Sequence, residues 1–324
     1  MDVCAGTTLD RIKVGKDEIT VMGKPVVVDA IWIENKEIIV TGKRIKMARI
    51  KDEWFGEEVE DPVSLLKKLN DCKYQADLFT FVQRLPENKP KYNYSMDWVS
   101  FAALPIISFD HWWEKQIPKD VRKKVKKAEK MGVIVKVVDF DDKFVEGITK
   151  IYNESPIRQG KPFWHYGKDF DTVKKEASTY LDKSDFMGAY YNDELIGFIK
   201  LVYLGKCAST MHVISEIKHR DKAPTNALLA KTVEICDRKK VHYLTYGEWN
   251  KGTLVDFKRY NGFVKTDLPR YYIPLTTKGK MVLKLNLHRG ASGLIPEGLI
   301  AYAVSLREKW YSKRMIEIKD SAKN

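Results

Sequence analysis

The stretch Gly188-Ala-Tyr-Tyr-Asn-Asp-Glu-Leu-Ile-Gly-Phe-Ile-Lys200 decides the fold of this chain. Apolar runs flank the polar pair Asn192-Asp193, a pattern typical of two antiparallel strands joined by a tight turn. Working outward in both directions, hydrophobic periodicity predicts strands and helices in alternation. The expected elements are a strand over 133–138, helices over 141–153 and 171–181, strands over 186–191, 195–204 and 207–214, a helix over 223–239, a strand over 241–248, a helix over 254–260 and a strand pair over 264–275.

Residues 1–109 show a different pattern. Short strands in which apolar and polar residues alternate are expected between 18 and 50, and apolar strands are expected near 76–83 and 101–109. Asp61-Pro62 predicts the start of a helix over 63–70, because aspartate caps helices and proline suits their first turn. A lysine-rich helix is expected over 110–130, with Gly132 ending it. The sequence therefore predicts a β-rich half over 1–109, an α+β domain over 110–279 with a mixed sheet flanked by helices, and a basic helical tail over 280–324.

Composition narrows the function. The 324 residues include 57 Lys and Arg against 44 Asp and Glu, a net charge of +13, which favours phosphate-bearing partners. Four scattered cysteines and a start without a basic-then-apolar leader indicate a soluble cytoplasmic protein. The most apolar stretch, 293–306, is too short to span a bilayer, so no stable membrane insertion is expected. The histidines lie in no carboxylate-rich frame, so no metal site is expected.

The element order β-α-α-β-β-β-α-β-α-β over 133–275 resembles that of a GNAT acyltransferase domain. The hairpin 188–200 looks like the central hairpin of that family, and Tyr243-Leu-Thr-Tyr-Gly-Glu-Trp-Asn250 looks like its last core strand. A narrower resemblance is to the Fem-type peptidoglycan aminoacyl transferases. Phe257-Lys-Arg-Tyr-Asn-Gly262 is similar to their Phe-Lys-x-x-aromatic-Gly signature, with one extra residue before the glycine. Lys127-Ala-Glu-Lys-Met-Gly-Val133 is similar to the basic run before their first strand.

The Fem-type resemblance implies that residues 1–109 form a degenerate GNAT-like half in front of the active one. It also implies where the activated acyl donor binds. A backbone N–H of Met211, His212 or Val213 would meet the donor carbonyl, and the turn over 216–226 would hold its phosphates. The donor-binding candidates in that turn are Lys218, Arg220, Lys222, Thr225 and Asn226. The glycines of the GNAT pyrophosphate turn are missing, which hinders close backbone approach to phosphate. The missing glycines therefore disfavour acetyl-CoA as the donor and favour an aminoacyl-tRNA.

The loop over 153–167 lies on the acceptor side in GNAT folds. Its acceptor-binding candidates are Arg158, Lys161, Phe163 and Trp164, since cations hold phosphate or carboxylate and aromatic rings stack on sugars or bases. The alternative for the two aromatic residues is a loop that plugs the core. His165 and Tyr166 are candidate catalytic residues, because an apolar core has no need of them.

Two further residues are candidates for catalysis by resemblance. Glu248, at the end of a predicted strand, could act as the base, and Lys258 could stabilise negative charge on the donor or oxyanion. The alternatives are a solvated strand end for Glu248 and a solvated helix lysine for Lys258. The sequence predicts an enzyme that moves an acyl group from acyl-CoA to a primary amine of an amino sugar or cell-envelope glycan precursor. Aminoacyl transfer from tRNA to a peptidoglycan-type peptide, and a non-catalytic nucleic-acid-binding module, are the alternatives.

Overall fold

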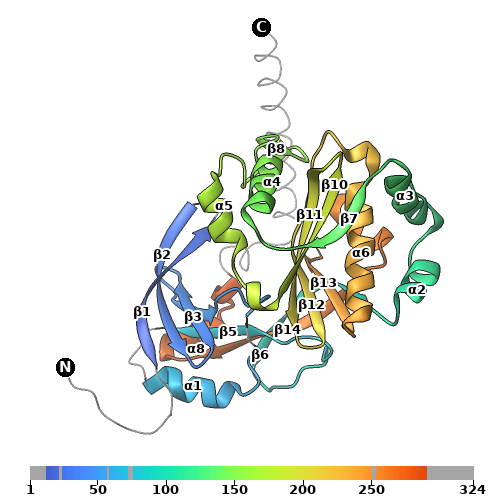
Figure 1. Ribbon diagram of the computed structural model, residues 1–324. Helices are drawn as coiled ribbons and strands as arrows, with labels where there is room; N and C mark the ends of the chain where they lie inside the picture. The colour runs from blue at the N-terminus through green and yellow to red at the C-terminus, as the bar shows by residue number, and fades with distance from the viewer. Residues whose placement is uncertain (1–11, 22–23, 57, 72–75, 250–252, 290–324) are drawn as a thin grey trace.

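One mixed sheet runs through nearly the whole described chain (Figure 1). The computed structural model describes residues 12–21, 24–56, 58–71, 76–249 and 253–289. The sheet has the order β1-β2-β3-β4-β5-β14-β6-β13-β12-β11-β10-β7. Its strands are β1 (Lys13–Val21), β2 (Lys24–Ile33), β3 (Lys36–Thr41), β4 (Met47–Ile50), β5 (Leu78–Val82), β6 (Ser95–Pro105), β7 (Ile134–Val138), β10 (Ser184–Tyr191), β11 (Glu194–Leu204), β12 (Cys207–Ser215), β13 (Tyr243–Glu248) and β14 (Val264–Pro274).

Helices and short turns flank this sheet. The helices are α1 (Pro62–Asp71), α2 (Phe109–His111), α3 (Lys119–Lys130), α4 (Asp142–Tyr152), α5 (Phe170–Ala177), α6 (Pro224–Arg238), α7 (Thr253–Tyr260) and α8 (Thr277–Lys284). A small hairpin, β8 (Ile157–Arg158) and β9 (Lys161–Pro162), forms a separate two-stranded sheet. The expected mixed sheet flanked by helices is therefore confirmed.

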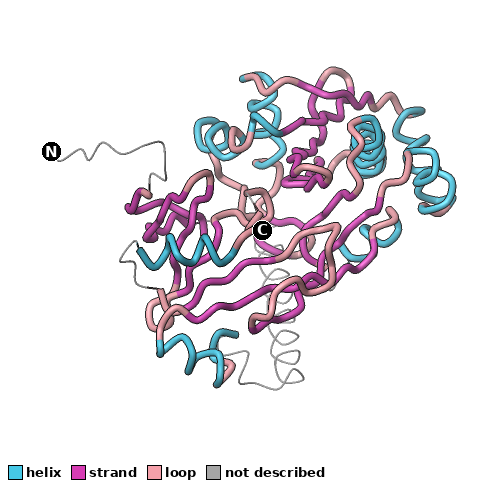
Figure 2. The backbone as a smooth tube through the Cα atoms, turned by 90° about the horizontal axis from the view of Figure 1, so that it is seen from below, coloured by secondary structure: helices cyan, strands magenta, loops and turns pink. Residues whose placement is uncertain are grey.

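The sheet consists of two halves with the same plan, joined by an exchange of strands. In each half four antiparallel strands lead to one parallel pair, β4 with β5 and β12 with β13. The strand that follows each parallel pair crosses over: β6 pairs with β13, β14 pairs with β5, and the two crossing strands pair with each other. Figure 2 shows the strands running continuously from one half to the other. The exchange fixes the two halves against each other through backbone hydrogen bonds.

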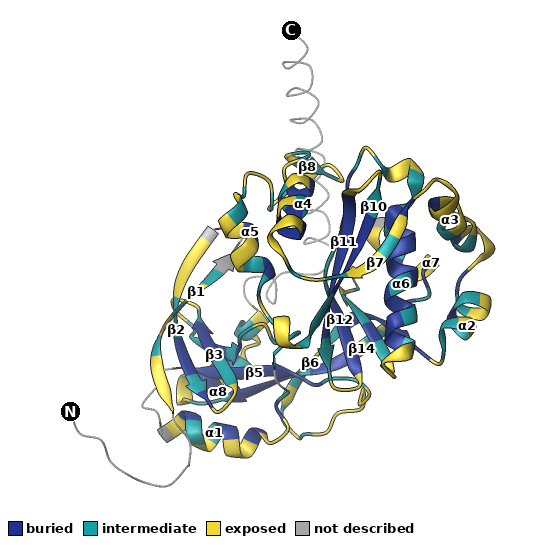
Figure 3. Cartoon of the chain, in the orientation of Figure 1, coloured by how far each residue is buried: buried dark blue, intermediate teal, exposed yellow. Residues whose placement is uncertain are grey.

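Helices cover the two faces of the second half. Helix α6 buries Leu228, Leu229 and Val233 against one face, and α4 buries Phe144 and Ile148 against the other. Figure 3 shows the inner sides of these helices and strands β10 to β12 buried, while α3 is largely exposed. Burial of these apolar faces is the main favourable term in folding, at about 25 cal/mol per Å².

Several local predictions are confirmed and three differ from the structure. The strand expected near 101–109 is β6, which runs from Ser95 to Pro105. Asp61 caps α1 by accepting hydrogen bonds from the backbone N–H groups of Val63 and Ser64, both at 3.0 Å, and Gly132 has the positive φ of 82° expected after a helix. The helix expected over 110–130 is interrupted before α3, because Pro118 cannot continue a helix. The strand pair expected over 264–275 is the single strand β14, whose two edges pair with different neighbours.

Candidate active site

The candidate active site lies where the parallel strands β12 and β13 part. Their Cα pairing ends at Ser209 and Thr245, and two side chains close this last rung. The Thr210 hydroxyl donates to the Thr245 carbonyl and the Thr245 hydroxyl to the Ala208 carbonyl, each at 3.3 Å. Beyond this rung the strands diverge toward Ser215 and Glu248, so the gap between them is available to a ligand.

Both parting strands are irregular at this level. On β12, Thr210 pairs with Leu201 and His212 with Lys200, so Met211 is the extra residue of a bulge. A bulge residue is left out of the regular ladder, which frees its backbone N–H for another acceptor. Met211 is one of the three residues, with His212 and Val213, whose backbone N–H the resemblance proposes for the donor carbonyl. On β13, Tyr246 and Gly247 lie opposite the single residue Ala102 of β6, so this strand also carries one extra residue, and Gly247 has a φ of 58°.

One cation holds the end of each parting strand. The Arg158 guanidinium donates from Nη1 to the carbonyl of Ser215, the last residue of β12, at 2.7 Å. The Lys258 ammonium donates to the carbonyl of Glu248, the last residue of β13, at 2.8 Å. Because Arg158 belongs to the acceptor loop and Lys258 to α7, the two contacts draw the strand ends toward different elements and keep the gap open.

Lys258 is a buried cation. Its residue is only 3 % exposed, and its ammonium lies 4.9 Å from the centre of the Tyr246 ring. Burial lowers the pKa of Lys258 to about 8, although the Glu248 carboxylate acts in the opposite direction. The solvated-lysine alternative is therefore wrong. The Glu248 side chain itself is exposed, as its solvated alternative expects.

Arg158 is engaged on three sides by the protein. Besides Ser215, it donates to the Ile151 carbonyl at 2.8 Å and to the Glu154 carboxylate at 3.1 Å, and it lies over the Phe163 ring at 4.6 Å. Glu154 in turn accepts the backbone N–H groups of residues 217 and 218 at 2.7 and 2.9 Å. The pair thus ties the acceptor loop to the turn before α6, which makes Arg158 a positioning residue rather than a free ligand for an acceptor.

A cleft of about 440 Å³ occupies the mouth of the gap. All four acceptor-binding candidates line it, together with Val213 and the donor-binding candidates Arg220 and Thr225. The sequence reasoning missed several lining residues, of which the main ones are Ser215, Tyr246, Leu254 and Phe257. Phe257 could have been found, because it precedes Lys258 within the motif that carries the Fem-type resemblance.

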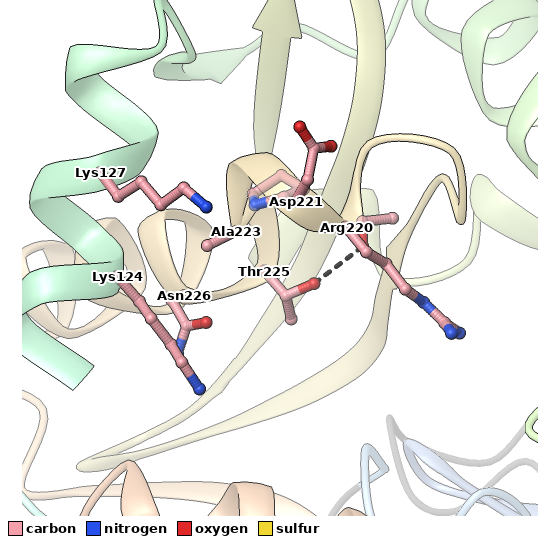
Figure 4. Close-up of a pocket in the computed structure, with 9 residues that line it drawn as sticks. Lys124, Lys127, Arg220, Asp221, Ala223, Thr225 and Asn226 are labelled. Atoms are coloured by element: carbon pink, nitrogen blue, oxygen red, sulfur yellow. Dashed lines mark hydrogen bonds between the residues drawn. The ribbon is translucent and has the colours of Figure 1, made fainter. Parts of the chain in front are cut away.

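A second pocket of about 340 Å³ lies at the start of α6 and shares Ser215, Arg220 and Thr225 with the cleft (Figure 4). In Figure 4, Lys124 and Lys127 extend from α3 toward the first turn of α6, and Arg220 extends on the far side of Thr225. The Thr225 hydroxyl is hydrogen bonded to that of Ser215 at 2.8 Å. We call the two joined hollows the donor groove.

The start of α6 offers few backbone donors to an anion. Ala223 has a left-handed φ of 53°, Pro224 has no N–H, and the Asn226 N–H donates back to the Ala223 carbonyl at 3.2 Å. Side-chain cations must therefore do most of the work of binding phosphate here. Lys124 and Lys127 were not among the predicted site residues, although their spacing of three places both on one face of the lysine-rich helix.

Lys218 and Lys222 do not join this groove. The Lys218 ammonium lies 3.3 Å from the Glu216 carboxylate, and that of Lys222 lies 4.8 Å from the centre of the Tyr191 ring. Neither residue lines the two hollows of the donor groove. Their proximity in sequence to Arg220 did not predict the direction in which the turn presents them.

His165 and His212 form a separate aromatic cluster. The His165 ring stacks on Tyr152 with centres 4.3 Å apart, and the His212 ring lies 5.6 Å away. Burial is the main cause that lowers the pKa of His165 to about 4, and the nearby Lys168 cation contributes in the same direction. Burial, followed by His165, lowers the pKa of His212 to about 3, so both imidazoles are neutral at pH 7. Tyr166 is 48 % exposed and lines neither hollow of the donor groove.

The described residues also bear on two other classes of site. No helix within them is long and apolar enough to cross a bilayer. Nor do they contain a group of three or more His, Cys, Asp or Glu that could hold a metal ion.

Comparison with solved structures shows the class of fold. The chain superposes on FemX with a TM-score of 0.53 at 9 % identity, covering 80 % of this chain and 88 % of FemX. It superposes on the C-terminal domain of a protein described as a lysylphosphatidylglycerol synthetase from Agrobacterium fabrum with a TM-score of 0.52 at 12 % identity, covering 81 % and 88 %. L-PGS from Bacillus licheniformis gives 0.51 at 15 % identity, covering 77 % and 84 %.

The chain therefore has the Fem-like form of the GNAT fold, as the sequence motifs predicted. The likeness is carried by the fold, since no family profile and no curated protein sequence matches the chain.

Proposed function

We propose that this protein is an acyltransferase that moves an acyl or aminoacyl group from a phosphate-bearing donor to a primary amine. The observation that carries the proposal is the pair of parted strands with the Met211 bulge at their fork, opening into a groove lined by Lys124, Lys127 and Arg220. Phosphate binds the cations, the donor carbonyl reaches the Met211 N–H, and the amine attacks from the acceptor loop.

In this reaction the amine nitrogen forms a bond to the carbonyl carbon, and the ester or thioester bond of the donor breaks. The proton lost by the amine passes to the leaving oxygen or sulfur. The Met211 N–H stabilises the oxyanion that develops, and a positive charge on Lys258 lowers its energy further. Glu248, exposed at the end of β13, is the candidate first acceptor of the proton.

Aminoacyl-tRNA is the donor that the start of α6 favours. A pyrophosphate held as in coenzyme A needs backbone N–H groups, which Ala223 and Pro224 do not supply. Helix α3 instead presents a row of exposed lysines beyond the groove, suited to a longer polyanion: Lys119, Lys123, Lys126 and Lys130. The names of FemX and of the lysylphosphatidylglycerol synthetase agree with aminoacyl chemistry on this fold.

Acyl-CoA remains the second candidate donor, because the pocket at the start of α6 is only about 340 Å³ and would suit a compact pyrophosphate. For the acceptor we propose an amine of an amino sugar, a cell-envelope glycan precursor or a peptide attached to it. The aromatic rings of Phe163 and Trp164 along the cleft support a sugar-bearing acceptor.

A salt titration of donor binding tests the proposal. We expect Lys124→Gln with Lys127→Gln to weaken aminoacyl-tRNA binding and to reduce the slope of log K against log salt by about 2, one for each lost phosphate contact. Lys143→Gln, at an exposed position of α4, is the matched control and should change neither. Preferential loss of coenzyme A binding would assign the donor as a thioester. Binding of tRNA without any aminoacyl transfer to amines would favour the non-catalytic module.

A further inference from the structure

A third hollow lies beyond the fork of β12 and β13, toward the first half of the chain. Its volume is about 100 Å³. Residues of both halves line it, among them Arg84 and Leu85 from the first half and Cys207, Ser209, Thr210 and Thr245 from the second. We propose that this inner pocket receives the aliphatic part of the transferred acyl group and so selects the donor. The inference rests on the proposed function and deepens it.

Its position relative to the bulge supports this occupant. Ser209 and Thr245 form the last rung of the parallel pair, and Thr210 directly precedes Met211. Consecutive Cα atoms are 3.8 Å apart, so the pocket begins within one residue of the N–H assigned to the donor carbonyl. An acyl group bound at Met211, with its leaving group in the donor groove, therefore has the inner pocket within reach of its substituent.

The chemistry of the walls specifies an uncharged group. Apolar side chains from both halves supply most of the surface, and the polar side chains of Arg84, Cys207, Thr210 and Thr245 have protein partners. The Cys207 thiol donates to the Leu85 carbonyl at 3.5 Å, and Arg84 donates from Nη2 to the carbonyls of Glu53 and Gly56, both at 2.6 Å. The lining residues include no carboxylate. An ammonium group, such as that of a lysyl substituent, would be buried there without a counter-ion, which is costly.

The size of the pocket limits the length of the substituent. An apolar protein cavity of about 150 Å³ binds benzene, which has six carbons. By the same ratio, about 100 Å³ holds roughly four carbons. The inner pocket therefore fits a leucyl, isoleucyl or pentanoyl substituent, leaves an acetyl or glycyl group poorly packed, and excludes a long fatty acyl chain.

The Cys207 thiol offers a readout that needs no transfer. In a Cys4→Ser, Cys72→Ser background we would measure the rate at which methyl methanethiosulfonate modifies Cys207, with acetamide, pentanamide or decanamide as competing probes. Cys236 is fully buried and reacts separately from Cys207, which is 9 % exposed. Three extra methylenes should give pentanamide roughly 50-fold higher affinity than acetamide, at about fourfold for each methylene. We expect protection by pentanamide at concentrations where acetamide and decanamide give none.

Filling the pocket should remove this preference. Ser209 is a buried strand residue whose replacement by a larger β-branched side chain suits a strand. We expect Ser209→Val to reduce the preference for pentanamide about tenfold and Ser209→Ile to abolish it. Ser95→Val, at an exposed strand position away from the pocket, is the matched control. If a thermal melt shows that one Ser209 variant does not fold, the other variant still tests whether filling the pocket removes the preference for pentanamide.

Equal protection by acetamide and pentanamide, or an unchanged preference in the folded Ser209 variants, would overturn the inner pocket as an aliphatic site. These results are independent of transfer, so they stand apart from a failure of the proposed function. In a transfer assay, Ser209→Ile should lower kcat/KM 10- to 100-fold for a leucyl donor and leave a glycyl donor unchanged. A change in acceptor selectivity with unchanged donor selectivity would overturn the acyl group as the occupant.

Discussion

The two halves of the sheet share a topology but treat their parallel strands differently. In each half the pair has three rungs, from Met47 to Arg49 in β4 and from Cys207 to Ser209 in β12. In the first half Arg84, just after β5, donates to two carbonyls of the loop that follows β4, and so joins the two strand ends. In the second half Arg158 and Lys258 each hold one strand end, and the gap stays open. The two halves thus differ in what their cations bind: Arg84 joins the ends of β4 and β5, whereas Arg158 and Lys258 bind the ends of β12 and β13 separately.

The helices that connect the parallel strands, α1 in the first half and α6 in the second, differ in how their N-termini are capped. Helix α1 begins at Asp61, whose carboxylate occupies the anion position of the helix start by accepting two backbone N–H groups. Helix α6 begins at Ala223 and Pro224 with no side-chain cap, and the cations of Lys124 and Lys127 lie beside it. The first half places a carboxylate directly on the first N–H groups of its helix, whereas α6 has no side-chain cap and starts beside a pocket lined by lysines as well as by Asp221.

The largest effect should come from Lys258. If its charge stabilises the oxyanion, Lys258→Met should lower kcat and kcat/KM alike by roughly 100- to 1,000-fold. Lys258→Arg should not fully restore activity, because a planar guanidinium cannot occupy the site of a compact ammonium. Steady-state kinetics of both variants, with thermal melts, make the measurement.

Arg84→Met is the matched change in the first half. It removes a cation from the corresponding strand ends, so we expect a loss of about 1–3 kcal/mol in the free energy of unfolding. Because Arg84 lines the inner pocket and not the fork, kcat should fall far less than in Lys258→Met. Turnover close to wild type in Lys258→Met would return that residue to a purely structural role and remove the functional difference between the halves.

The second prediction concerns pH and the stability of the second half. The folded-state pKa of Lys258 is lowered from 10.5 to about 8, so between these values the unfolded chain binds more protons than the folded one. Stability should therefore rise as pH increases from 8 to 10.5, by up to about 3 kcal/mol from this residue. Urea unfolding across that window should show a shallower rise in Lys258→Met.

Lys200 remains as an internal reference in that experiment. Its pKa is likewise lowered to about 8 by burial, and its ammonium donates to the carbonyls of Ala177 and Thr179. Part of the rise should thus persist in the methionine variant. An identical pH profile in wild type and Lys258→Met would show that the Lys258 ammonium is solvated.

Arg158 should give a smaller, mixed effect. Arg158→Ala releases the end of β12 and the acceptor loop together, so we expect the acceptor KM to rise about tenfold and the free energy of unfolding to fall by about 2 kcal/mol. Glu154→Gln keeps an oxygen acceptor for only one of the two backbone N–H groups and removes the charge beside Arg158, so it should reproduce part of the KM change. A raised acceptor KM with wild-type stability would identify Arg158 as a direct ligand.

The smallest effect belongs to the first half. Asp61→Ala removes the cap of α1 and should cost about 1 kcal/mol of stability without changing kcat/KM. Thermal unfolding and a transfer assay on the same preparation measure both. A loss of activity beyond threefold would mean that the capped helix of the first half contributes to the site.

Sequence patterns predicted the parts of this molecule that local chemistry determines. The hairpin at Asn192-Asp193, the caps at Asp61 and Gly132 and the helix bearing Lys258 were all predicted, because turn residues and apolar periodicity act over a few residues. The strand exchange was not, since the pairing of β6 with β13 and β14 depends on contacts between residues that are at least 138 positions apart.

In the candidate site, too, local sequence patterns did not predict contacts between residues that are distant in the chain. The motif around Lys258 placed that residue in the helix that follows β13, yet nothing local indicated that its ammonium would bind the Glu248 carbonyl instead of water. Lys218 and Lys222 were chosen for their proximity to Arg220, but the short turn before α6 directs them elsewhere. Lys124 and Lys127 reach the site from a helix that packs against α6 only in the folded chain.

A crystal structure with a non-hydrolysable donor analogue, an aminoacyl group linked by an amide to the terminal adenosine of a CCA trinucleotide, tests most directly whether the open half is the site of acyl transfer. We expect the amide carbonyl oxygen between β12 and β13, within about 3 Å of the Met211 N–H. Its phosphates should lie beside Lys124, Lys127 and Arg220. An analogue bound between β4 and β5, or held on α3 with the fork of β12 and β13 empty, would contradict the account.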